Sequence, residues 1–248
     1  MKHLFPSMLH ILCLAHLFHR IAQKIMDEYP DVNLLLTNIK RVFEKSKRRK
    51  SEWKSRSPNK NDFPIPSKIR WCTWIESCVY VAKFYSHLKQ YLSTISSKEN
   101  RAASDAAVSM DQPSLRQNVS YISSLDIIIQ KTKNAQEGSY GALQGLTDIN
   151  DLTSAFQNQP TNPAAQISLK KLNKLMDKNQ DFCRMTQILS GDIVPDDPTL
   201  FSALVHSSIT SVNVERFFSI LKSFKQVRPN VSAEAFNRLL MIRYNHSL

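Results

Sequence analysis

Residues 71–95 read WCTWIESCVYVAKFYSHLKQYLSTI and carry the clearest structural pattern in the chain. Apolar side chains recur here every three or four residues, which is the spacing that places them on one face of an α-helix. The positions on this face are Trp71, Trp74, Ile75, Cys78, Ala82, Tyr85, Leu88, Leu92 and Ile95. The spacing therefore predicts one helix over 71–95.

The same helical period appears on both sides of this stretch. It predicts further helices over 14–29, 31–50, 114–136 and 166–190, and two shorter ones near the C-terminus. Residues 8–13 form a short apolar run that favours a strand. Polar residues without a stable period predict flexible loops near 96–114 and 157–165. The expected fold class is mainly α, with at most one or two short strands near the N-terminus.

Glycine is scarce, with four residues in 248. A P-loop and a G-x-G-x-x-G dinucleotide turn both need glycines that let the backbone approach a phosphate. Neither motif is present, nor is a G-x-S-x-G nucleophile elbow. No apolar run reaches the length of a transmembrane helix. We therefore expect no small-molecule substrate and no membrane partner.

Positive charge is concentrated in one segment. The chain carries 33 Lys and Arg against 21 Asp and Glu, a net charge of +12, and residues 40–60 hold ten Lys or Arg and two Glu, a net +8. Such a run is a contact to nucleic-acid phosphates, a nuclear localisation signal or a solvated helix end. The candidate residues are Lys47, Arg48, Arg49, Lys50, Lys54 and Arg56. We expect DNA as a partner and a nuclear location.

Three segments, in this order, resemble blocks of the hAT transposase superfamily. Cys13-Leu14-Ala15-His16-Leu17 is similar to the family's C-x-x-H block, and Ile69-Arg70-Trp71 is similar to its Thr-Arg-Trp motif. Residues 211–219, SVNVERFFS, are similar to the S-x-x-x-E-R-x-F-S block of its C-terminal dimerisation region. The chain thus resembles the C-terminal portion of such a transposase.

The resemblance implies an RNase H-like core interrupted by a helical insertion. Residues 1–66 would then be a core remnant with a strand, helices and the basic linker. Residues 67–200 would correspond to the insertion, and residues 201–248 to the dimerisation region. Dimerisation is expected to use the apolar residues Val214, Phe217, Phe218, Leu221, Phe224, Phe236, Leu239 and Leu240.

The resemblance also implies a chemistry that this sequence does not complete. The family cuts DNA with metal ions held by two Asp and one Glu, and Glu215 matches that Glu. Both Asp residues precede the C-x-x-H block in the family, whereas the twelve residues before Cys13 include no acid. Because one carboxylate does not hold a pair of Mg²⁺ ions, we expect no enzymatic activity, a relict Glu215 and no cofactor. Mg²⁺ would be expected only if upstream sequence supplied the missing ligands.

Two of the family motifs have alternative interpretations. Cys13 and His16 are either metal ligands or a buried strand end with a structural histidine, and no further Cys or His pair has zinc spacing. The resemblance places Arg70 and Trp71 against DNA, where Trp71 would stack on an unpaired base. Trp71 also lies on the apolar face of 71–95, which favours packing in the core.

We therefore expect a transposase-derived, catalytically incomplete protein that dimerises and contacts DNA nonspecifically. Its partner would be a second copy of the chain or a related transposase. The alternative is the C-terminal half of an active hAT transposase whose catalytic Asp residues are missing from this chain.

Overall fold

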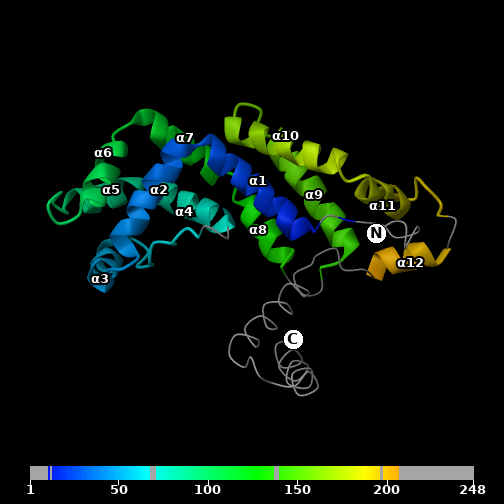
Figure 1. The fold of residues 1–248 in the computed structure, drawn as a ribbon, viewed down its shortest axis with the longest axis horizontal. Coiled ribbons are helices and arrows are strands. Elements are labelled where there is room, and N and C mark those ends of the chain that lie inside the picture. Colours follow the sequence, from blue (N-terminus) through cyan, green and yellow to red (C-terminus); the bar gives the residue numbers. More distant parts are fainter. Residues whose placement is uncertain (1–10, 12, 68–70, 137–139, 196–197, 207–248) are drawn as a thin grey trace, which may run out of the picture.

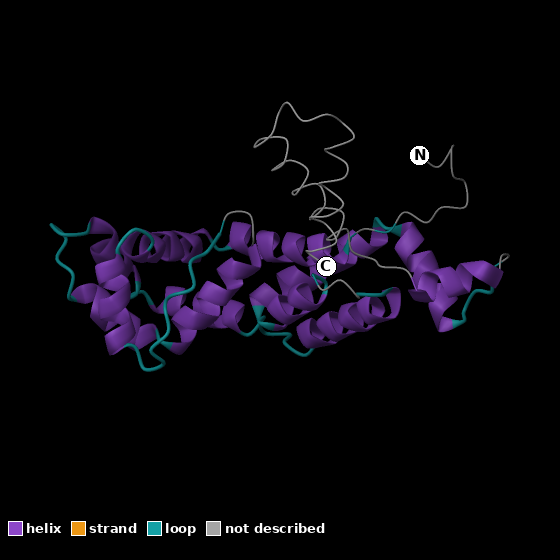
Figure 2. Ribbon diagram, turned by 90° about the horizontal axis from the view of Figure 1, so that it is seen from below, coloured by secondary structure: helices purple, strands orange, loops and turns teal. Residues whose placement is uncertain are grey.

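The computed structural model describes residues 11, 13–67, 71–136, 140–195 and 198–206. Within these ranges the regular elements are α-helices and no strand is present (Figure 2). The expected mainly α class is confirmed. The helices are α1 (Leu14–Glu28), α2 (Pro30–Phe43), α3 (Lys47–Arg56), α4 (Trp71–Lys83), α5 (Tyr85–Ser93), α6 (Arg101–Ser109), α7 (Pro113–Ser123), α8 (Ile127–Asn134), α9 (Ala142–Gln157), α10 (Pro163–Asp177), α11 (Gln180–Ser190) and α12 (Pro198–His206).

The helices form an elongated body with α1 in its middle (Figure 1). Helix α1 packs against α4, α8 and α10. Its apolar stripe is at most 1% exposed at Leu14, Leu17, Phe18, Ile21 and Ile25. Helices α3, α5 and α6 lie at one end of the body, and α11 and α12 lie at the other. The spacing of the N-terminal apolar residues thus predicted the central helix correctly.

Helix α2 follows α1 after a sharp bend at Tyr29, whose φ and ψ are −122° and 65°. Proline disfavours helical backbone in the residue before it and is itself favoured in the first helical turn. Pro30 and Asp31 therefore start a new helix, and the carboxylate of Asp31 lies near the positive end of the helix dipole. The boundary predicted at Pro30 is confirmed.

Predicted helix 71–95 is divided into α4 and α5. The break is at Phe84, whose φ and ψ are −116° and 24°. Phe84 itself and Tyr85, which begins α5, are both buried. The prediction of one helix was wrong because the chain bends while its side chains stay in the same core, so the apolar period continues across the break.

The predicted helices 31–50, 114–136 and 166–190 are divided in the same way. Helix α3 starts anew because the Ser46 side chain accepts a hydrogen bond from Arg49 N at 3.3 Å. Helix α11 likewise begins with the Asn179 side chain accepting from Phe182 N at 3.2 Å. Such caps satisfy backbone donors at a helix start. The spacing of apolar residues does not indicate where they occur, so the periodicity did not predict these helix boundaries.

The flexible loop expected near 96–114 is wrong for its central part, which forms α6. The Asn100 side chain caps this helix by accepting from Ala103 N at 3.1 Å. Ala103, Ala106 and Ala107 are buried, and α6 packs against α2 and α5. Small alanines let the helices approach closely, but they give little hydrophobic contrast in the sequence.

The loop expected near 157–165 is shorter than predicted, since α9 ends at Gln157 and α10 begins at Pro163. Asn162 orders its end. Its side chain accepts from Ala164 N at 3.0 Å and donates to Tyr121 O at 3.0 Å. The connection is therefore tied to α7 as well as to α10.

The expected strand 8–13 falls mostly on residues outside the described ranges. The two positions that the structure does describe, Ile11 and Cys13, belong to no strand, and Leu14 begins α1. Of the expected region 201–248, residues 201–206 belong to α12, and the remainder lies outside the described residues.

Candidate nucleic-acid interface

The basic segment is held in place by an aromatic cluster made of Phe43, Trp53, Phe63, Tyr80, Phe84 and Tyr91. The rings of Phe43 and Tyr91 stack at 6.0 Å, and those of Trp53 and Tyr91 lie 5.5 Å apart. Trp53 is the buried residue of α3 and is 1% exposed. One anchoring side chain therefore fixes an otherwise polar helix on the body.

Hydrogen bonds orient this anchor. Trp53 Nε1 donates to Tyr80 Oη at 2.8 Å, and Tyr80 Oη donates to Asn61 O at 3.0 Å. Burial raises the pKa of Tyr80, and burial with the nearby Glu52 carboxylate raises the pKa of Tyr91 to about 12. Both phenols are therefore protonated at neutral pH and remain hydrogen-bond donors.

The arginines of the segment are engaged within the protein. Arg48 and Arg49 both pair with Glu99, at 3.3 Å for Arg49, and Arg48 also lies 3.4 Å from Glu52. The hydrogen bonds from Arg49 and Arg48 lower the pKa of Glu99. The Arg56 guanidinium lies 5.6 Å from the ring centre of Tyr91. These three cations already have partners.

The lysines differ from the arginines. The ammonium groups of Lys47, Lys50 and Lys54 make no hydrogen bond or ion pair with any other described residue. Their spacing of three and four residues places them on one face of α3. Lys47 and Lys54 are exposed and Lys50 is half-buried. We call these three residues the α3 lysine face.

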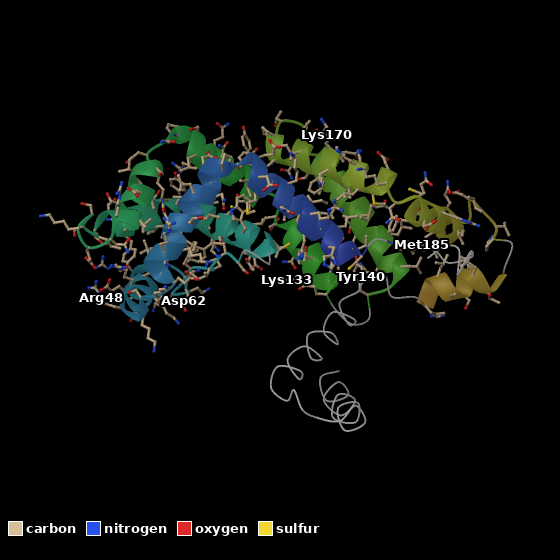
Figure 3. All side chains as sticks on the ribbon, viewed as in Figure 1. Arg48, Asp62, Lys133, Tyr140, Lys170 and Met185 are labelled. Carbon is tan, nitrogen blue, oxygen red and sulfur yellow. The ribbon has the colours of Figure 1, made fainter. Side chains whose placement is uncertain are left out.

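Two further exposed lysines, Lys45 and Lys60, flank α3 and were not among the expected site residues. They belong to the same basic run, so composition alone could have included them. Lys40 differs, because its Nζ lies 3.0 Å from Pro66 O and 3.5 Å from Glu44. The charge available to a partner therefore comes from a subset of the run. Arg48 marks this end of the molecule in Figure 3.

The structure does not bring the start of α4 against the basic helix. Tyr80 contacts α3, whereas Cys72, at the other end of α4, lies 3.1 Å from Thr132 of α8. Trp71 and Tyr80 are nine positions apart in α4, which is about 13 Å along the axis. Arg70 and the side chain of Trp71 lie outside the described residues, so stacking and core packing both remain predictions.

The C-terminal candidates also lie outside the described residues. They are the expected relict Glu215 and the expected dimerisation residues Val214, Phe217, Phe218, Leu221, Phe224, Phe236, Leu239 and Leu240.

Cys13 immediately precedes α1, and His16 lies in its first turn with its ring 6.4 Å from that of His19. Over the ranges that the structure describes, no three His, Cys, Asp or Glu side chains gather as a metal site.

None of the helices in the described ranges combines the length and apolar character needed to cross a membrane. Comparison of the chain with protein-family models, with curated proteins and with solved structures found no match.

Proposed function

We propose that this protein binds the phosphate backbone of nucleic acid, nonspecifically, through the α3 lysine face. The observation that carries the proposal is that three neighbouring ammonium groups have no partner among the described residues, while the buried Trp53 fixes their helix. Lysines that neutralise phosphates release condensed counterions, which drives binding without reading the sequence.

The geometry suits a backbone contact. Lys47 and Lys54 are seven residues apart, about 10 Å along the helix axis. Successive phosphates on one DNA strand rise by about 3.4 Å, so this face spans roughly three of them. Arginine is the residue suited to bidentate contacts with bases, and Arg48 and Arg49 are paired with Glu99. The face therefore favours contact without base readout.

The test is a salt titration of duplex DNA binding by the full chain and by a variant carrying Lys47→Gln, Lys50→Gln and Lys54→Gln. Each phosphate contact removed reduces the slope of log affinity against log salt by about one. We expect the slope to become less negative by about three. An unchanged slope in this variant contradicts the proposal.

The matched control keeps the charge and changes only the side chain. Lys47→Arg, Lys50→Arg and Lys54→Arg should preserve most of the slope, because the contact depends on charge. A second control, Arg116→Gln, Lys133→Gln and Arg184→Gln, removes three charges from α7, α8 and α11. It should leave the slope nearly unchanged if the contact is local to α3.

A second proposed function, self-association, rests on a different observation. The sequence block 211–219 resembles the dimerisation region of hAT transposases, and the apolar residues between Val214 and Leu240 follow helical spacing. In this proposal the chain is transposase-derived and pairs with itself or with a related transposase. Light scattering after size-exclusion chromatography tests it, and a strict monomer at tens of micromolar contradicts it.

We further propose that this chain does not cleave DNA. The support is that Glu215 is the one residue of these 248 that matches the family's three metal-binding carboxylates. The full chain should leave a supercoiled plasmid intact in millimolar Mg²⁺. Cleavage that disappears in a Glu215→Gln variant would instead support the alternative, an active transposase.

A further inference from the structure

A second group of cations gathers on α1 and α10, away from α3. Helix α10 lies along one edge of the body and packs against the central helix α1 (Figure 1). Lys170 points outward from α10 in Figure 3. We call this group the α1/α10 cationic surface, and its residues are Arg20, Lys24, Lys170, Lys171, Lys174 and Lys178.

The helical spacing explains why these charges lie together. Lys170, Lys174 and Lys178 follow one another every four residues, about 6 Å apart along the axis. Leu172 and Leu175 face the core and are at most 4% exposed. The lysines therefore occupy the solvent side of α10, and the half-buried Lys171 lies on the flank toward α1.

The charges of this surface are largely uncompensated. Burial lowers the pKa of Lys171, and so do its positive neighbours Arg20, Lys174, Lys24 and Lys178. Lys24 pairs with Glu28. The other acids on the two helices, Asp27 and Asp177, are exposed and make no ion pair among the described residues. The free protein therefore tolerates repulsion here that a polyanion would relieve.

We propose that the α1/α10 cationic surface is a second site for the phosphate backbone of nucleic acid. It shares its class of partner with the proposed function but rests on different residues, so the two proposals can fail separately. The arrangement in Figure 1 places α3 at one end of the body and α10 along the other half.

The structure favours nucleic acid over an anionic membrane as the partner. A helix that lies on a membrane buries an exposed apolar face among the lipids. The apolar faces of α1 and α10 are instead used inside the protein, as Ile21, Ile25 and Leu172 show with at most 1% exposure. What remains outside is charge, which matches a phosphate backbone.

The test uses a duplex of about 30 base pairs, which is about 100 Å long at 3.4 Å per pair. The full chain is compared with a variant carrying Lys171→Gln, Lys174→Gln and Lys178→Gln. We expect the salt slope to become less negative by about three, and the affinity at 0.1 M salt to fall by about tenfold or more. Far-ultraviolet circular dichroism checks that the helices are retained.

Two matched controls isolate the surface. Lys171→Arg, Lys174→Arg and Lys178→Arg should keep the slope, because they keep the charge. Arg116→Gln, Lys133→Gln and Arg184→Gln remove the same number of charges from other helices and should leave it nearly unchanged. If this control variant, with Arg116→Gln, Lys133→Gln and Arg184→Gln, loses as much affinity and salt slope as the α10 variant, the proposal is overturned. Net charge alone would then explain the effect.

The remaining outcomes distinguish the two proposals and the alternative partner. If the α10 variant loses affinity while the α3 variant does not, the second site stands and the proposed function falls. If the α10 variant binds duplex like the parent chain, the second site is overturned. If it binds duplex normally but no longer binds phosphatidylserine vesicles, the surface belongs to a membrane contact and the proposal is also overturned.

Discussion

Glu99 controls how much of the basic segment a partner can reach. It lies in the connection between α5 and α6 and pairs with Arg48 and Arg49, fifty residues earlier in the chain. Because these pairs lower the pKa of Glu99, the carboxylate stays ionised at neutral pH and remains paired with both arginines. If the proposed contact with nucleic acid is correct, Glu99 occupies the position of a phosphate on these two arginines.

Glu99→Gln should strengthen DNA binding. The change frees two guanidinium groups beside the α3 lysine face, so the salt slope should become more negative by about one to two. The measurement is the same salt titration with nonspecific duplex. Glu76→Gln is the control, since Glu76 pairs with Lys133 at 3.0 Å between α4 and α8. Equal gains in both variants would show that overall charge, not the release of the arginines, is responsible.

Asp148 is the most deeply buried carboxylate among the described residues, at 0% exposure. It accepts from Lys131 Nζ at 2.8 Å, from Gln144 Nε2 at 2.9 Å and from Tyr140 Oη at 3.0 Å. Burial and this carboxylate raise the pKa of Tyr140, which therefore remains a donor. The network ties α8 to α9 and to the segment between them.

Asp148→Ala should lower the free energy of unfolding by about 3 kcal/mol or more, because the Tyr140 hydroxyl loses its buried acceptor and Lys131 keeps only the more exposed Asp151. Asp151→Asn is the matched control. Asp151 also pairs with Lys131, at 2.5 Å, but is 48% exposed, so its loss should cost under about 1 kcal/mol. Urea unfolding followed by circular dichroism measures both. Similar losses in the two variants would contradict the assignment of Asp148 as the member that holds the network.

At the scale of the element, α6 shows that a helix can depend on small residues. Ala106 is 0% exposed where α6 packs on α2 and α5. Ala106→Leu adds volume to this contact and should destabilise the protein by about 1–3 kcal/mol. Val108, on the same helix, is 65% exposed, so Val108→Leu should change stability by less than about 0.5 kcal/mol. Thermal unfolding of the two variants checks the contrast, and a neutral Ala106→Leu would place α6 away from the core.

The sequence predicts the apolar faces of the helices better than it predicts where the helices end. The stripe of 14–29 is buried as expected, and so is that of 71–95 except for the half-buried Ala82 and for Trp71, whose side chain lies outside the described residues. Burial is the direct cause of their period. The bend at Phe84 and the cap at Ser46 depend on local backbone geometry, which the period does not record. Helix α6 was missed because alanine packing gives no strong period.

For the candidate site too, the sequence predicts one part and only the tertiary structure shows the other. The sequence predicts where the basic charge lies, since composition alone shows the excess in 40–60. It does not show which cations are free. Arg48 and Arg49 are engaged because Glu99 returns to α3 through tertiary structure. The lysines of α10 are visible in the sequence as a run at helical spacing, but Arg20 and Lys24 lie about 150 positions earlier and join them only through the packing of α1 on α10.

At the scale of the whole molecule, the excess of positive charge opposes folding. The chain has 33 Lys and Arg against 21 Asp and Glu, and one group of them crowds around Lys171. Net charge far from zero destabilises a compact state by self-repulsion. Most of the ion pairs among the described residues involve exposed groups, which contribute little to stability. Repulsion should therefore outweigh these pairs.

Sodium chloride should consequently stabilise the free protein. Raising it from 0.01 M to 0.1 M shortens the Debye length from about 30 Å to about 10 Å, which screens repulsion across the elongated body. A gain of about 1 kcal/mol would raise Tm by about 2–4 °C in a chain of this size. The variant with Lys171→Gln, Lys174→Gln and Lys178→Gln should have the higher Tm at 0.01 M and a smaller rise with salt, because it lacks part of the repulsion. A Tm that falls with salt in the parent chain would mean that attractive pairs dominate, and the cationic surfaces would then carry no cost for a nucleic acid to relieve.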